Sequence, residues 1–205
     1  METKHWRKVQ LFFFSLMILA WVIFGLIPKL NSPEGEGLPV LDQAVPFILE
    51  DAYQEAYDSN NQKVKLLAFF YTNCPDICPM TMMDFAKLQE ELKEKQLFGS
   101  KVELIAITLD PKVDTSEVIA SYAKKFKADQ QGWKFLRGTP EQTKTIADFY
   151  HMKYKKTEGN FIAHNTTMFL IDQNNQIRGL YDMANAKNSV DTAQIMEAIE
   201  RLTNK

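Results

Sequence analysis

The sequence has no basic stretch interleaved with aromatic residues, no internal repeat and no low-complexity tract. Its formal net charge is only −2 at pH 7. These absences give no support to a nucleic-acid partner, because such proteins cluster lysine and arginine on one face. The 205 residues, 45% hydrophobic and 24% charged, are instead typical of one globular domain with room for an appendage.

Charge and proline are both absent from residues 9–27. The run is close to the length of about 20 residues that a helix needs to span a bilayer. Residues 1–8 carry three basic side chains, whereas only Lys29 is basic between the apolar run and Lys63. The positive-inside rule therefore predicts a single transmembrane helix with residues 1–8 in the cytoplasm and the chain after Pro28 outside it.

A cleaved signal peptide is the alternative for this segment, but no small-x-small cleavage site follows the apolar run. No cysteine lies there either, which excludes a bacterial lipoprotein anchor. An uncleaved anchor in the cell membrane is favoured. Residues 28–45, rich in acidic residues, glycine and proline, predict a linker, and residues 46–205 an extracytoplasmic domain.

Hydrophobic periodicity predicts an alternation of strands and helices after the linker. Strands are expected over residues 47–49, 52–57, 64–71, 102–109, 133–136, 166–171 and 176–181, and helices over 80–97, 114–127, 139–150 and 188–202. Residues 151–165 show only weak periodicity. This order indicates an α/β sheet with helices on both faces, and a thioredoxin-like fold is the best candidate.

The only two cysteines, Cys74 and Cys78, lie where the first long strand gives way to a helix. Unpaired N–H groups and the positive end of a helix dipole favour thiolate there, which is both nucleophile and metal ligand. Three residues separate the pair, not the two of a thioredoxin redox motif. In a helix their Cα atoms would be about 6 Å apart. That separation permits either a disulfide or a shared metal ion.

His164 differs from the other two histidines because it ends an irregular stretch directly before a strand. In a thioredoxin-like sheet the turn before that strand lies beside the turn that holds the two cysteines. Two thiolates and one imidazole make a plausible Cu(I) site, and a Cu(II) site with added oxygen or water. His5 and His151 are interpreted as solvated side chains.

Three blocks of the sequence resemble the Sco/SenC family, the proteins for synthesis of cytochrome c oxidase. Residues 70–79 contain the cysteine block, residues 110–115 resemble the second block, and residues 164–172 the third. The resemblance covers residues 45–203, with the blocks in the family's order. It implies a membrane-tethered, thioredoxin-like copper protein that helps to assemble the binuclear copper centre of cytochrome c oxidase.

By that resemblance Cys74, Cys78 and His164 are copper ligands, for Cu(I) or Cu(II). The implied partner is cytochrome c oxidase subunit II, with other copper carriers and thiol reductants as further partners. Asn165 and Ala163 depart mildly from the family's usual neighbours of the histidine.

The sequence leaves a second function open, that of a thiol–disulfide oxidoreductase which keeps the copper-ligating cysteines of its target reduced. Whether the protein is an enzyme is therefore undecided. Two further features have two interpretations each. Asp110 either orients a ligand or ends a strand in an Asp-Pro turn. Methionines 80, 82 and 83 either pass Cu(I) along or, as we favour, pack the start of the helix.

Overall fold

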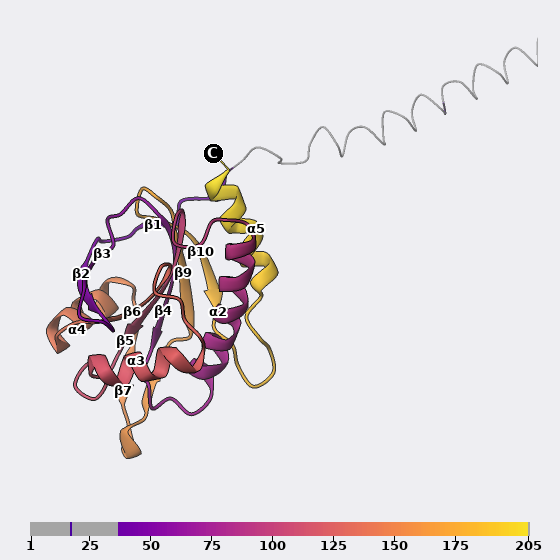
Figure 1. Ribbon diagram of the computed structural model, residues 1–205. Helices are drawn as coiled ribbons and strands as arrows, with labels where there is room; N and C mark the ends of the chain where they lie inside the picture. Colours follow the sequence, from indigo (N-terminus) through magenta and orange to yellow (C-terminus); the bar gives the residue numbers. More distant parts are fainter. Residues whose placement is uncertain (1–16, 18–36, 205) are drawn as a thin grey trace, which may run out of the picture. The chain divides into compact units, whose positions relative to one another are not determined.

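The computed structural model describes Met17 and residues 37–204. Within residues 37–204, strands and helices follow one another in α/β order (Figure 1). The elements are β1 (Asp42–Gln43), β2 (Ile48–Asp51), β3 (Ala56–Asp58), β4 (Val64–Phe70), α2 (Ile77–Glu94), β5 (Val102–Thr108), α3 (Ser116–Lys125), β6 (Trp133–Arg137), α4 (Pro140–Phe149), β7 (Tyr154–Lys156), the 3₁₀ turn η1 (Glu158–Asn160), β8 (Ile162–His164), β9 (Thr167–Ile171), β10 (Gln176–Asp182) and α5 (Thr192–Thr203).

Eight of the described strands form one mixed sheet in the order β1-β10-β9-β4-β5-β6-β2-β3. Strands β4, β5 and β6 run parallel, and β9 pairs antiparallel with β4. All seven residues of β4 and all seven of β5 are buried, as expected for central strands covered on both faces. These two strands are the rigid centre to which the other elements are attached.

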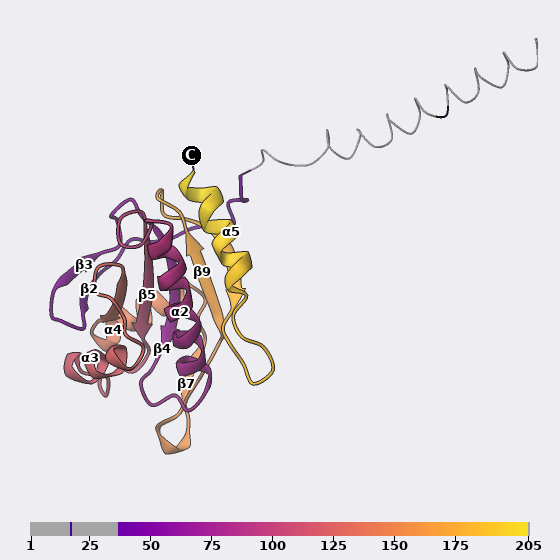
Figure 2. The same cartoon turned by 45° about the vertical axis from the view of Figure 1, so that its right-hand side comes forward.

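Successive residues of β4 point to opposite faces of the sheet. Phe70 stacks on Tyr122 of α3, with ring centroids 5.6 Å apart. Phe69 meets Tyr150, at the end of α4, with centroids 6.0 Å apart. Helices α3 and α4 therefore cover opposite faces. Helices α2 and α5 pack side by side, as both views show (Figures 1 and 2).

The predicted α/β architecture is confirmed, with differences at the boundaries of elements. Helix α2 begins at Ile77, three residues before its expected start. Residues 151–165, expected to be irregular, contain β7 and β8, which pair antiparallel as a separate two-stranded sheet. Asp42 and Gln43, placed in the linker by sequence, pair with β10 as β1. Helix α5 begins at Thr192 and not at residue 188.

The expected membrane anchor, residues 9–27, lies outside the described residues except for Met17. The expected cytoplasmic segment, residues 1–8, lies outside them as well. Within the part of the chain that the structure describes, no helix is long and apolar enough to cross a membrane.

Candidate metal centre

The two cysteines lie in residues 71–78, which run from the end of β4 into the first turn of α2 and are called the cysteine turn. The N–H of Cys74 donates to the carbonyl of Tyr71 at 3.2 Å, which closes the turn. Asp76 caps α2, and its carboxylate accepts the N–H of Ile77. Pro79 fits in the first helical turn because the N–H it lacks would have no partner inside the helix. Cys78 therefore lies in the first turn of α2, where it is fully buried.

Both thiols are free, and they lie against each other. The backbone N–H of Cys78 donates to Sγ of Cys74 at 3.3 Å. Cys74 precedes the N-cap of α2, so the pair does not lie on one face of a helix, the arrangement that a fully helical segment would give. The turn brings the two sulfur-bearing residues together instead.

The two thiols differ strongly in acidity. Hydrogen bonding from the Cys78 thiol lowers the pKa of Cys74 to about 6, helped by the N–H groups of Cys78 and Asp76 and by the Tyr71 hydroxyl, against the effect of burial. The same thiol–thiol hydrogen bond, together with burial, raises the pKa of Cys78 above its ordinary value. At pH 7 Cys74 is mainly thiolate and Cys78 is a thiol that donates to it.

Asp114 holds the cysteine turn from the loop between β5 and α3. Its carboxylate accepts the N–H of Thr72 at 3.2 and 3.3 Å, and the hydroxyls of Thr72 and Thr108. The side chain is 1% exposed. Burial raises its pKa, and the hydrogen bonds from Thr108 and Thr72 oppose that shift. Sequence analysis missed this role because Asp114 looks like the start of a capped helix, whereas the cap is Thr115.

His164 ends β8, opposite Tyr154 of β7. Its Nδ1 lies 2.6 Å from the carbonyl oxygen of Asn165. A carbonyl can only accept, so Nδ1 carries the proton and Nε2 keeps a lone pair. Burial lowers the pKa of His164, partly offset by the hydrogen bond to Asn165, so the ring is neutral at pH 7. This is the protonation state in which imidazole binds a metal.

Tyr71 connects the histidine with the cysteine turn. Its ring meets that of His164 edge to face, with centroids 6.1 Å apart and an interplanar angle of 82°. Burial raises the pKa of Tyr71 to about 12, and the negative charge of Cys74 adds to this shift. Sequence analysis did not single out Tyr71, which reads there as the last residue of a buried strand.

The three predicted ligands are thus neighbours, but they do not converge. Among the described residues, no three side chains of histidine, cysteine, aspartate or glutamate lie close enough together to hold a metal ion. The structure places Cys74 and Cys78 in one turn and His164 across the ring of Tyr71. A metal ion bound by all three would require His164 to approach the sulfur atoms.

The structure also shows the surroundings of Asp110 and of the three methionines, for which the sequence left two interpretations each. Asp110 forms an ion pair with Lys156 of β7, with Oδ2 and Nζ 3.0 Å apart. Met82 is fully buried and Met80 packs partly against the core, as expected for packing residues, whereas Met83 is 59% exposed.

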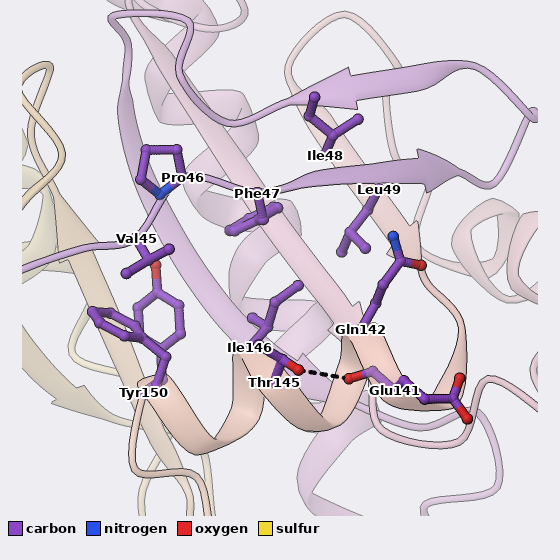
Figure 3. Close-up of a pocket in the computed structure, with 11 residues that line it drawn as sticks. Val45, Pro46, Phe47, Ile48, Leu49, Glu141, Gln142, Thr145, Ile146 and Tyr150 are labelled. Atoms are coloured by element: carbon purple, nitrogen blue, oxygen red, sulfur yellow. Dashed lines mark hydrogen bonds between the residues drawn. The ribbon is translucent and has the colours of Figure 1, made fainter.

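An apolar pocket of about 570 Å³ lies between α4 and residues 45–49, which lead into and form part of β2 (Figure 3). Neither cysteine lines it, and His164 does not line it either. The hydroxyl of Thr145 donates to the carbonyl of Glu141 within α4 and so is already partnered. This pocket is separate from the cysteine turn.

The model of one protein family, SCO1/SenC, matches residues 41–204. A SCO2-like protein of Rickettsia typhi is 34% identical over 138 residues, which cover 62% of this chain and 64% of that relative, so the match spans less than two thirds of the relative's length. A SCO1/SenC family lipoprotein of Bacillus anthracis has a similar structure, with a TM-score of 0.72 at 25% identity over 80% of this chain and 96% of that one.

The crystal structure of Arabidopsis thaliana ScoI with copper bound is also similar, with a TM-score of 0.65 at 27% identity. The similarity covers 79% of this chain and 99% of that one. These neighbours confirm the α/β, thioredoxin-like class of the fold.

Proposed function

This chain belongs to the SCO1/SenC family, and from that premise we propose that it is a copper-binding assembly factor for cytochrome c oxidase. Copper is its cargo. Cys74 and Cys78 bind it through sulfur, and His164 binds it through Nε2. The recipient is the binuclear copper centre in subunit II of the oxidase, reached directly or through other copper carriers.

The observation that carries this proposal is the pair of thiols in the β4–α2 turn. One is already a thiolate near neutral pH, and the other keeps one proton, held by a raised pKa, that a bound copper ion would have to displace. Soft sulfur ligands favour Cu(I), and imidazole suits copper in both oxidation states. The copper-bound Arabidopsis relative supports the same cargo.

His164 fits the third position chemically. The carbonyl of Asn165 fixes the proton on Nδ1 and leaves Nε2 free, as is usual for histidines that bind metals. The chain would offer the two sulfur atoms first, and His164 would complete the site from the β7–β8 hairpin. Three ligands in a turn and a hairpin are suited to release as well as to capture, because one of them can withdraw.

A second function, thiol–disulfide exchange, is favoured by the difference in acidity between the thiols. The Cys74 thiolate would attack a disulfide of the partner and release one partner thiol. Cys78 would then attack Cys74, forming the Cys74–Cys78 disulfide and releasing the second thiol. Two electrons pass to the partner, and an external thiol reductant must restore the pair. Both functions can serve the same copper centre.

We also propose that residues 9–27 anchor the protein in the cell membrane with residues 1–8 in the cytoplasm. The domain would then lie on the extracytoplasmic side. Protease added to cells stripped of their outer layers should digest the domain and spare residues 1–8. Protection of the domain would contradict the orientation and the proposed function together.

The copper proposal is tested by anaerobic titration of the reduced full-length protein with copper. His164→Ala should lower Cu(II) affinity by at least about tenfold, or about 1.4 kcal/mol. The matched control is His151→Asn, because His151 has a φ of +50°, which asparagine tolerates. That control should bind copper as the parent does. Oxidised protein should bind poorly until it is reduced.

The His164→Ala variant also distinguishes copper delivery from thiol–disulfide exchange. His164→Ala should still form and reduce the Cys74–Cys78 disulfide, because exchange depends on the thiolate and its accessibility. In cells it should impair assembly of the oxidase's copper centre. Full oxidase activity together with unchanged copper affinity would remove His164 from the ligand set and leave thiol exchange as the better account.

A further inference from the structure

The β7–β8 hairpin presents one face to the rest of the domain. Cross-strand partners share a face, as do alternate residues of one strand. Tyr154 pairs with His164, and Lys156 pairs with Ile162. These four side chains therefore share one face of the hairpin. Ile162 is 6% exposed, and the His164 ring contacts Tyr71, so this face packs against the domain.

Lys156 makes a charged contact from that face. Its Nζ lies 3.0 Å from Oδ2 of Asp110, which is in the loop after β5. The Asp110 side chain is 10% exposed and that of Lys156 46%. A largely buried carboxylate holds a cation more firmly than a surface carboxylate does, because less water competes for it. The ion pair ties the hairpin to the loop between β5 and α3.

The same loop also holds the cysteine turn. The Asp110 carbonyl accepts the N–H groups of Val113 and Asp114, at 3.0 and 2.9 Å, so the loop is a tight turn. Asp114 binds Thr72, two residues before Cys74. One short loop thus contacts both halves of the proposed site, the cysteine turn through Asp114 and the histidine hairpin through Asp110.

We propose that the Lys156–Asp110 ion pair positions His164 beside the cysteine turn. Lys156 is a positioning residue: it shares a hairpin face with His164 and fixes that face to the loop that also holds Thr72. The pair confines the hairpin and so lowers the cost of bringing the histidine to the cargo. This purpose rests on the proposed function, whereas the positioning itself can be measured without copper.

The copper-free test uses nuclear magnetic resonance of the reduced full-length protein. The ring of Tyr71 shifts the imidazole C–H resonances of His164 as long as the two rings stay in contact. In Lys156→Met, which keeps most of the side chain's length and removes its charge, these resonances should move toward those of an exposed histidine. The His151 resonances serve as an internal reference.

Hydrogen exchange of two hairpin amides measures how much the ion pair stabilises the closed hairpin. The N–H of Asn165 donates to the Lys153 carbonyl at 3.1 Å, and that of Thr157 to the Phe161 carbonyl at 2.8 Å. Loss of the ion pair should speed their exchange about two- to fivefold, the range for a partly exposed pair. High salt should speed exchange in the parent and change little in Lys156→Met.

Three variants complete the design. Lys156→Arg keeps the charge and should restore the parent's resonances and exchange rates. Asp110→Asn should act like Lys156→Met, and the double variant should be no worse than either single one. Lys155→Met is the matched control, because Lys155 is exposed on the opposite face of β7 and forms no ion pair within the described part of the chain.

Copper titration then shows whether the position of His164 affects copper affinity. Lys156→Met should lower Cu(II) affinity about two- to fivefold, and should have no further effect once His164 is alanine. Unchanged His164 resonances in Lys156→Met, or an equal change in Lys155→Met, would overturn the inference. If His164→Ala itself binds copper normally, the proposed ligand set fails, and the resonances still decide the positioning.

Discussion

The cysteine turn and the histidine hairpin are held by very different amounts of structure. Cys78 lies in the first turn of an 18-residue helix that follows a fully buried central strand. Asp114 fixes the segment between them with several hydrogen bonds. His164 ends a three-residue strand of a hairpin that does not belong to the main sheet. The contacts that attach that hairpin are the buried Ile162, the partly buried Tyr154, the Lys156–Asp110 ion pair, and the contacts of Tyr71 with the His164 ring and with the backbone of Ile162.

This difference indicates how the site would work. The half that supplies the sulfur atoms is built into the core and keeps its geometry. The half that supplies the imidazole is attached by few contacts, so it can open at a small free-energy cost. If copper binds to all three groups as proposed, the hairpin is the part that we expect to move, because it is held by fewer contacts than the cysteine turn.

The largest effects should come from matched truncations in the two halves. Ile107 of β5 is fully buried, so Ile107→Ala should lower the free energy of unfolding by about 2–5 kcal/mol. Ile162→Ala should lower it less, because its loss cannot exceed the free energy that keeps the hairpin closed. Urea unfolding measures both variants. Equal losses would show that the hairpin is as firmly held as the core.

Asp114→Ala should come next in size. It leaves the donors of Thr72 and Thr108 without their acceptor in a buried site, at a cost of about 2–4 kcal/mol in the free energy of unfolding. The same change at the exposed Asp182 should stay within about 0.5 kcal/mol. A cost at Asp114 no larger than at Asp182 would mean that the cysteine turn does not need its anchor.

The firmly held half is also the half that sequence predicts best. Strands β4 and β5 are continuous apolar runs because both of their faces are covered. The start of α4 is marked by Thr139 and Pro140, and the structure has a full capping box there, completed by Gln142. Cys74, Cys78 and His164 could be selected because each stands at a boundary between elements.

The weakly held half has no such pattern. Strands β7 and β8 are three residues long and mostly exposed, so alternation has no room to show in the sequence. The partners that matter lie far apart along the chain: Asp110 pairs with Lys156, 46 residues later, and Thr72 with Asp114, 42 residues later. Such contacts depend on how the sheet brings its loops together, which local propensity does not contain.

A third prediction concerns acidity within the cysteine turn. Alkylation of Cys74 by iodoacetamide should reach half its maximal rate near pH 6, and Cys78 should not react because it is buried with a raised pKa. Cys78→Ala removes the main hydrogen bond to the thiolate and should raise the pKa of Cys74 by about one unit or more. Alkylation at pH 7 would then be slower, since less thiolate is present.

Two further variants test whether the histidine hairpin influences the acidity of the cysteine turn. Cys78→Ser keeps a hydroxyl that can donate, and should keep the pKa of Cys74 low. His164→Ala should leave that pKa unchanged, because the groups that lower it belong to residues 71–78. A rise in His164→Ala would show that the hairpin already acts on the thiolate and that the two halves are not independent.

The smallest effect should come from Tyr71, the residue that touches both halves. Tyr71→Phe removes the hydroxyl that donates to Cys74, the weakest of the influences that lower its pKa, so this pKa should rise less than in Cys78→Ala. The aromatic ring stays, so the His164 resonances should keep their shift. Tyr71→Leu should lose both the hydroxyl and the ring contact. The backbone of Ile162 in β8 also acts on the Tyr71 hydroxyl and opposes the rise in its pKa. If Tyr71→Phe alone moves the His164 resonances, this polar contact helps to hold the hairpin; if it does not, the ring contact is sufficient.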